Sequence, residues 1–303
     1  MSARTRKTLM VVNRTLWIVF LILAAVSFPV ELPIGFLWIL LLGVSAMAFG
    51  IVLNRALGKD HDRARQPAAV EVDPPVAGRW TALNSPADKV PSHGTHGYGQ
   101  SYAIDITAEP SPEPSPEPSP GASPEPSPGA EGTVPGRPGF AWLWPLVRRP
   151  GAYPAFGTPL YAVADATVVH ASGGQRDHLS RSSLPMVLYL LLIEAAARDM
   201  AGPARVFGNR IVLDLGDGVY AAYAHVQRGS LAVREGERVR AGQLLARCGN
   251  SGNSTEPHLH FQLMDSPDLD AARGIPFRWR GVGVPANGGI FDAEEPAPQT
   301  AAD

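Results

Sequence analysis

The sequence predicts a mostly β protein, a small antiparallel split barrel or sandwich, preceded by a two-helix transmembrane hairpin. Two uncharged apolar blocks near the N-terminus predict the hairpin. In the C-terminal half, short β-rich runs alternate with glycine-containing turns, among them Gly216-Asp217-Gly218, which is typical of antiparallel strands joined by tight turns. A chain of 303 residues has room for one such core beside a membrane module.

The apolar blocks cover residues 15–30 and 34–53, and neither contains a charged side chain. Each is close to the roughly 20 residues that an α-helix needs to cross a bilayer core. Pro29 and Pro33 predict a tight connection between them, because proline ends a helix. We therefore predict two transmembrane helices within a membrane module of residues 1–58. A signal peptide is the alternative for the first block, but no small-residue cleavage site precedes the second.

The composition of the remaining residues predicts a linker, one globular domain and a tail. Residues 59–75 are polar and carry prolines, which predicts a linker. A single globular domain is expected over 76–290, followed by a disordered tail over 291–303. Two insertions interrupt that domain, one proline-rich over 108–139 and one helical over 171–206.

The two insertions differ in what they can form. Residues 110–128 repeat Ser-Pro-Glu-Pro, a composition that favours polyproline II and a solvated spacer, with a ligand for an SH3-type domain as the alternative. In the second insertion, Ser183 as N-cap, Pro185 in the first turn and an apolar run over 186–193 predict one helix that ends at Gly202. We expect this helix to pack against the sheet or to cover a cleft.

His258 and His260 form the strongest chemical signal. They are one residue apart in a β-rich run, and side chains on a strand alternate between faces, so both imidazoles project from one face. Two imidazoles on one face can serve a single metal site.

The surrounding residues 249–261 resemble the signature of the LytM and lysostaphin type zinc metallo-endopeptidases, a peptidoglycan hydrolase family with the duplicated hybrid motif fold. Residues 157–169 and the hairpin 209–220 are similar to strands of that family, and His225 in Tyr-Ala-His stands where the family has a histidine that faces the zinc. The glycine-punctuated run 233–245 also occurs in biotin and lipoyl carrier domains. A carrier needs a lysine at that turn, and this chain has lysine only at positions 7, 59 and 89.

The resemblance implies a Zn²⁺ cofactor and a set of site residues. His260 and Asp105 correspond to metal ligands, and His258 and His225 to the catalytic pair, one as general base and the other stabilising the tetrahedral intermediate. The family usually has a histidine four residues before the aspartate, where this chain has Ser101. Residues 92–100 resemble a variant of the family in which this histidine lies farther from the aspartate, which implies His93 as the missing ligand, with His96 as the alternative. If neither binds metal, the site is degenerate.

The implied function is that of a hydrolase that cleaves peptide bonds in the stems or cross-bridges of bacterial peptidoglycan. The alternative is a non-catalytic family member that binds cell wall or activates a partner hydrolase. The retained Asp105, His225, His258 and His260 favour the enzyme.

Two features make opposite predictions for the side of the membrane on which the C-terminal domain lies. Basic residues flank both apolar blocks and are missing from the turn between them, which by the positive-inside rule places both ends in the cytoplasm. Peptidoglycan lies outside the membrane. We expect a multi-pass protein of the bacterial cell membrane with an extracytoplasmic catalytic domain, against the charge pattern, because charge controls the translocation of long domains only weakly.

Charge and cysteine content restrict the partners further. The formal net charge of −2 argues against a nucleic-acid partner, which leaves the membrane and a peptidoglycan peptide. The lone Cys248 excludes an internal disulfide and is expected to be a buried, inert thiol.

Overall fold

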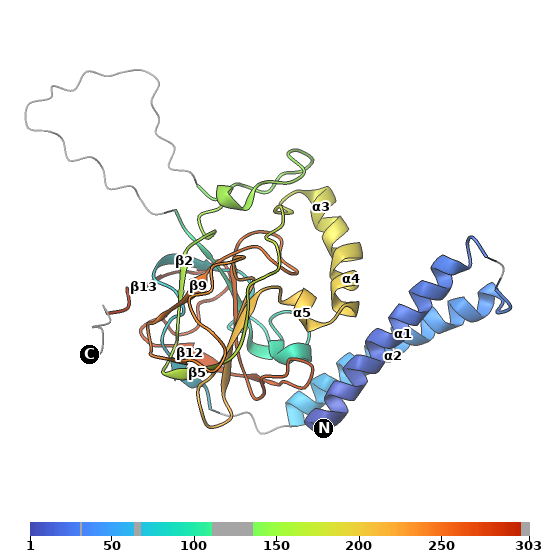
Figure 1. Ribbon diagram of the computed structural model, residues 1–303, viewed down its shortest axis with the longest axis horizontal. Helices are drawn as coiled ribbons and strands as arrows, with labels where there is room; N and C mark the ends of the chain where they lie inside the picture. The colour runs from blue at the N-terminus through green and yellow to red at the C-terminus, as the bar shows by residue number, and fades with distance from the viewer. Residues whose placement is uncertain (31, 64–67, 111–135, 298–303) are drawn as a thin grey trace, which may run out of the picture.

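The computed structural model, shown in Figure 1, describes residues 1–30, 32–63, 68–110 and 136–297. The proline-rich repeat over 111–128 and residues 298–303 of the expected tail lie outside the described residues. The described part consists of a helical hairpin, a β domain and a helical appendage along one edge of that domain (Figure 1).

The hairpin is formed by α1 (Ala3–Val26) and α2 (Phe36–Arg63), which pack against each other. Both helices are long and apolar enough to cross a membrane by length and composition. They extend past the predicted spans at the end nearest the β domain. At that end Ser2 caps α1, because its hydroxyl oxygen accepts from the Thr5 amide at 3.1 Å.

A buried ion pair and a buried hydrogen bond fasten the base of the hairpin to the β domain. Arg14 of α1 pairs with Asp270, with 2.7 Å between Nη2 and Oδ1. Arg6 is buried and donates from Nη1 to the carbonyl of Ala272 at 2.9 Å, while its Nη2 pairs with Asp60 of α2 at 3.2 Å. Both ends of the hairpin therefore lie on the same side as the β domain (Figure 1).

Among the described residues the main sheet has nine strands, and every pairing within it is antiparallel. In spatial order its strands are β13 (Ile290–Ala293), β2 (Gly78–Ala82), β3 (Ile104–Ala108), β10 (Leu259–Met264), β7 (Tyr220–Ala224), β6 (Arg210–Asp214), β5 (Ala166–Ser172) and β8 (Arg238–Val239), with β11 (Gly274–Ile275) added beside β10. The predicted mostly antiparallel β class is confirmed.

Two small sheets complete the domain. β4 (Pro159–Tyr161) pairs with β9 (Leu244–Arg247), and β1 (Val70–Val72) pairs in parallel with β12 (Phe277–Trp279). One apolar core joins all three sheets, and it includes the fully buried Trp80, Leu160, Ile211, Leu245, Phe261 and Trp279.

Three boundaries differ from those predicted. α2 continues to Arg63 and β1 lies at Val70–Val72, both inside the expected linker 59–75. β13 includes Phe291, Asp292 and Ala293, which were assigned to the disordered tail. Pairing with distant strands orders β1 and β13, and no local sequence pattern predicts such pairing.

The helical insertion forms α3 (Leu184–Tyr189), the π-helical turn η3 (Leu190–Glu194), α4 (Ala195–Met200) and α5 (Pro203–Val206). Ser183 is the N-cap residue as predicted, but its hydroxyl donates to the Leu146 carbonyl at 2.7 Å and makes no capping bond. Leu190 is buried, whereas Leu188 and Leu191 are exposed. Of the two expected placements, on the sheet or over a cleft, the second agrees better with the structure, because Val187 of α3 lines a pocket together with Thr255 and Glu256. The α4 end of the insertion contacts α1.

Candidate metal centre

Asp105 and His260 face each other across neighbouring strands. Asp105 lies on β3 and His260 on β10, and the antiparallel register pairs these two residues directly. The Nδ1 atom of His260 lies 2.9 Å from Oδ1 of Asp105, and both side chains are buried. The sheet thus places a carboxylate and an imidazole from distant parts of the sequence at one point.

His93 reaches the same carboxylate from the segment that precedes the short helix η1 (Gly97–Tyr102). Its Nε2 lies 3.0 Å from Oδ2 of Asp105. The hydroxyl of Ser92 donates to the Ala103 carbonyl at 2.6 Å, so its oxygen accepts from Nδ1–H of His93 at 2.9 Å. That hydrogen bond leaves the Nε2 lone pair of His93 directed at the site.

His96, the alternative ligand, lies elsewhere. Its Nδ1 is 3.0 Å from the Ser101 hydroxyl, and its ring packs on His61 of α2 with centroids 4.3 Å apart. The structure therefore brings the first choice, His93, to Asp105 and holds His96 against the base of the hairpin.

The donor atoms of His93, Asp105 and His260 all lie within 4.8 Å of one another. Two donors on one tetrahedral zinc, at bond lengths of roughly 2.0–2.2 Å, lie about 3.4 Å apart. The two contacts to Asp105, 3.0 and 2.9 Å, are close to that spacing. Two imidazoles and a carboxylate are also ligands that zinc accepts, so these residues fit the metal that the resemblance implies.

Two further residues orient these donors. Gln262 accepts from Nε2–H of His260 at 3.0 Å and donates from its own amide to the Tyr98 carbonyl at 2.8 Å, which leaves Nδ1 of His260 free to ligate. Asn84 donates from Nδ2 to Oδ2 of Asp105 at 2.8 Å. Our sequence reasoning missed both residues. Gln262 could have been found, because it continues the two-residue alternation of His258 and His260 along the strand.

His225 and His258 lie beside the three donors, with their ring centroids 4.7 Å apart. The Nδ1–H of His225 donates to the Ser251 carbonyl at 2.8 Å, and that of His258 to the Glu256 carbonyl at 2.7 Å. His225 adopts a left-handed φ of 61°, uncommon for a residue with a side chain. Both rings thereby have their Nε2 atoms free of these backbone contacts.

The buried cluster shifts the pKa values of its members in different directions. Burial by itself raises the pKa of Asp105, but the neighbouring His93 and His258 hold that pKa well below its usual range. Burial and the repulsion of His258 and His260 lower the pKa of His225 far below its ordinary value. Burial also lowers the pKa of His258, yet the charge of Asp105 outweighs burial and raises that pKa. The carboxylate is thus the electrostatic centre of the site.

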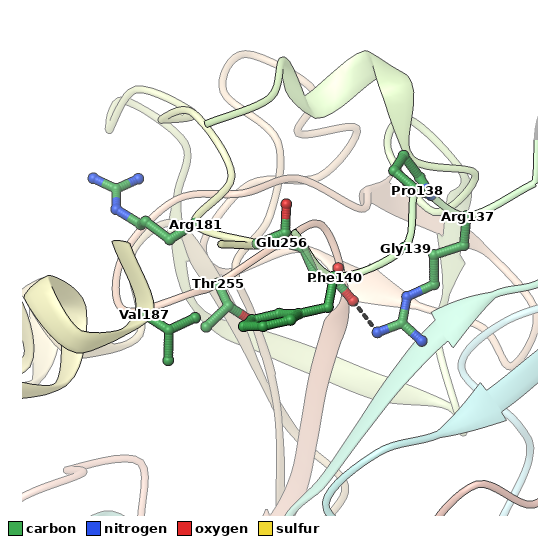
Figure 2. A pocket seen from close by; sticks show the side chains of 9 residues that line it. Arg137, Pro138, Gly139, Phe140, Arg181, Val187, Thr255 and Glu256 are labelled. Carbon is green, nitrogen blue, oxygen red and sulfur yellow. Dashed lines mark hydrogen bonds and ion pairs between the residues drawn. The ribbon is translucent and has the colours of Figure 1, made fainter. Parts of the chain in front are cut away.

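A pocket of about 440 Å³ opens beside the loop that carries His258 (Figure 2). Thr255 and Glu256 of that loop form one wall, and Phe140, which directly follows the first insertion, and Val187 of the second insertion face them. Arg137 forms an ion pair with Glu256 inside the pocket (Figure 2). The insertions, distant in sequence, therefore meet at the loop that leads into the candidate site.

Part of this site lies in a segment that is similar to a known protein family. The description of Peptidase family M23 matches residues 196–271, a segment that contains His225, His258 and His260. The matched segment is about a quarter of the chain, so the similarity to this family is a similarity of that segment. His93 and Asp105 lie outside the M23 segment, so their part in the site rests on the contacts above.

Similar proteins include glycyl-glycine endopeptidase ALE-1 of Staphylococcus capitis, 47% identical over 58 residues, which are 19% of this chain and 16% of that protein. Peptidoglycan DD-endopeptidase ShyA of Vibrio cholerae serotype O1 is 35% identical over 57 residues, 19% of this chain and 13% of that protein. The chain thus spans a small part of the length of these relatives. The solved catalytic domain of lysostaphin from Staphylococcus simulans covers 46% of this chain and 86% of its own, at 24% identity and a TM-score of 0.26.

Proposed function

We propose that this chain is a membrane-anchored zinc metallo-endopeptidase that hydrolyses peptide bonds in the stems or cross-bridges of bacterial peptidoglycan. The observation that carries the proposal is the convergence of His93, Asp105 and His260 on one point, with His225 and His258 beside it. The M23 segment and the likeness to endopeptidases of the cell wall support the substrate class.

The roles of the residues follow from their contacts. When bound by two imidazoles and a carboxylate, zinc would polarise the carbonyl of the scissile peptide bond and lower the pKa of water towards about 7. His93, Asp105 and His260 would hold it. His225 and His258 are each fixed by an Nδ1–H bond to a backbone carbonyl, so each can exchange a proton at Nε2. One would take the proton from the attacking water, and the other would stabilise the oxyanion.

Zinc content and hydrolysis, measured on the full chain in detergent, test this function together. The purified protein should hold about one zinc and release new amino groups from peptidoglycan. Asp105→Ala and His260→Ala should lose both the metal and the activity, because two remaining ligands hold zinc poorly. His258→Ala should keep much of the metal and lose turnover.

Two results would contradict the assignment. Full zinc content in the His260→Ala protein would show that His260 is not a zinc ligand. A zinc-loaded wild-type protein that binds peptidoglycan without cleaving it would favour the non-catalytic alternative.

The extracytoplasmic location is part of the same proposal. The base of the hairpin is docked on the β domain, so the two helix ends and the domain share one side of the membrane. A reporter that is active only when exported, fused after Asp303, should be active in intact cells. Activity of a cytoplasm-only reporter at that position would exclude the role as a wall hydrolase.

A further inference from the structure

The segment that follows the proline-rich insertion presents an apolar tip to solvent. Trp142 is 75% exposed, Leu143 70% and Trp144 80%. Phe140 is exposed beside them, and its ring meets that of Trp142 edge to face, with centroids 6.1 Å apart. Large apolar side chains gathered on a surface mark contacts with a partner or a membrane.

Backbone hydrogen bonds hold the base of this loop. The Ala141 amide donates to the Ser182 carbonyl at 2.8 Å, and the Ser180 amide donates to the Arg148 carbonyl at 2.8 Å. Arg148 also donates from Nη1 to the Gly139 carbonyl at 2.9 Å, which closes the loop across its base. The tip is thus fixed in its exposed position by the second insertion.

α3 and η3 extend the apolar surface. Residues 184–193 contain no charged side chain, and Leu188, Leu191 and Ile193 are exposed. A surface helix in water normally turns a polar face outward, and this one does not. We call the loop 140–146 together with these exposed side chains of α3 and η3 the apolar edge.

The apolar edge extends from the place where the hairpin meets the β domain. α4 continues η3 and contacts α1. Near the end of α4, the guanidinium of Arg14 approaches Gly202 and pairs with Asp270. Arg14 immediately precedes the first predicted span. Figure 1 shows α3 with the loop above it and the hairpin diverging from this contact on the same side of the domain.

We propose that the apolar edge is a second membrane contact, seated in the interfacial region of the bilayer that the hairpin spans. The proposal rests on the membrane anchoring in the proposed function. Tryptophan favours the headgroup level of a bilayer, where its ring is apolar and its N–H remains hydrated. Arg148 and Arg149 follow the loop, and residues 136–164 contain no acidic side chain that anionic lipid would repel.

The bilayer explains the composition of the edge better than a protein partner does. Protein interfaces surround their apolar centre with a polar rim that makes specific hydrogen bonds. Tyr189 is the only residue over 184–193 with a polar side-chain group. A bilayer needs apolar area and interfacial aromatics, and the edge supplies both.

This contact bears on the candidate site through the pocket of Figure 2. Phe140 of the loop 140–146 and Val187 of α3 line that pocket on one side, and Thr255 and Glu256 of the loop that leads to His258 line it on the other. A bilayer that holds the apolar edge therefore fixes one wall of the pocket. The site would then act on peptides that lie at the membrane surface.

Tryptophan fluorescence of the full chain in phosphatidylcholine and phosphatidylglycerol vesicles tests the contact. The chain has six tryptophans, and Trp80 and Trp279 are buried in the core. In a Trp17→Phe, Trp38→Phe background, the remaining accessible emission comes from the apolar edge. Lipids brominated on the acyl chain should quench most of that emission, and aqueous iodide should quench little of it.

The matched control adds Trp142→Phe and Trp144→Phe to the same background. It should lose the quenching by brominated lipid and keep the emission of Trp80 and Trp279, which reports that the core is folded. Quenching by iodide in place of lipid would overturn the proposal, and so would quenching by neither, which would indicate cover by protein. Trp17 and Trp38, tested alone, report the spans, and peptidoglycan hydrolysis reports the enzyme, so each failure is separable.

Discussion

Replacing His93 and His96 separately by alanine would decide which histidine binds the metal. His93→Ala removes the Nε2 atom that lies 3.0 Å from Oδ2 of Asp105, one of three donors within 4.8 Å. His96→Ala removes a ring that packs on His61 and whose Nδ1 is 3.0 Å from the Ser101 hydroxyl. The first change alters the donor set, whereas the second alters the contact with the hairpin.

The expected magnitudes differ clearly. Changing a residue that merely orients a ligand typically costs about 10–100-fold in metal affinity. Removing a ligand itself should cost at least the upper end of that range, so His93→Ala should weaken zinc binding by about 100-fold or more, roughly 2.8 kcal/mol. His96→Ala should leave zinc affinity unchanged and lower the free energy of unfolding by about 1 kcal/mol through its lost hydrogen bond.

Competition with a chromophoric zinc chelator measures both affinities on the full chain in detergent. His170→Ala serves as a matched control, because His170 pairs with Glu235 on the far part of the sheet. Loss of zinc in His96→Ala with retention in His93→Ala would exchange the two assignments. Retention in the double variant would refute the reasoning, because Asp105 and His260 would then hold the metal without either histidine.

Three further results are expected. Gln262→Leu should weaken zinc binding by about 10–100-fold while the fold is kept, because it releases the ligand ring that Gln262 orients; unchanged affinity in the chelator assay would remove it from the site. Burial raises the pKa of Cys248, so iodoacetamide should leave the native thiol unmodified at pH 8 and alkylate it only after unfolding, as mass spectrometry would report. Asp270→Ala leaves the nearly buried Arg14 without its partner and should lower the free energy of unfolding by about 3 kcal/mol. Lys7→Ala, which removes an exposed ion pair with Asp268, should cost much less, and equal losses in thermal denaturation would contradict a buried clamp.

The alternation of residues along one strand made part of the site predictable. His258 and His260 are two residues apart, so a single local rule places them on one face. The partner of His260 could not be derived in this way. Its contact with Asp105 depends on the register between β3 and β10, which are separated by most of the domain in sequence. The resemblance supplied Asp105, and the register places it opposite His260.

Local sequence patterns could not decide whether His93 or His96 is the metal ligand. Both precede η1, where Tyr98 has a positive φ of 57°, and no helical or strand periodicity applies to their segment. The difference between the two histidines arises from what each ring contacts. His93 is fixed by Ser92 towards Asp105, and His96 meets the hairpin. Contacts between a loop and distant elements carry no signature in the sequence around the loop.

The helical insertion gives the opposite lesson. Ser183, Pro185 and the apolar run after them predicted the start and the existence of the helix correctly. The apolar run left two placements open, on the sheet or over a cleft, because it states that a segment avoids water but not what covers it. Leu188 and Leu191 belong to the apolar run but are exposed in the folded protein. In the proposed membrane contact the bilayer covers these two side chains, as the sheet covers a core residue.

The basic residues at the base of the hairpin can be explained in two ways, and the second explanation comes from the structure. By the positive-inside rule they place the ends of the hairpin in the cytoplasm. In the folded protein, however, Arg14 pairs with Asp270, Lys7 with Asp268, and Arg6 with Asp60. These cations therefore have a structural reason to be basic on either side of the membrane. Their presence weighs less as a topology signal than an equal number of unpaired lysines and arginines would, so the proposed peptidoglycan substrate is the stronger argument for the proposed extracytoplasmic domain.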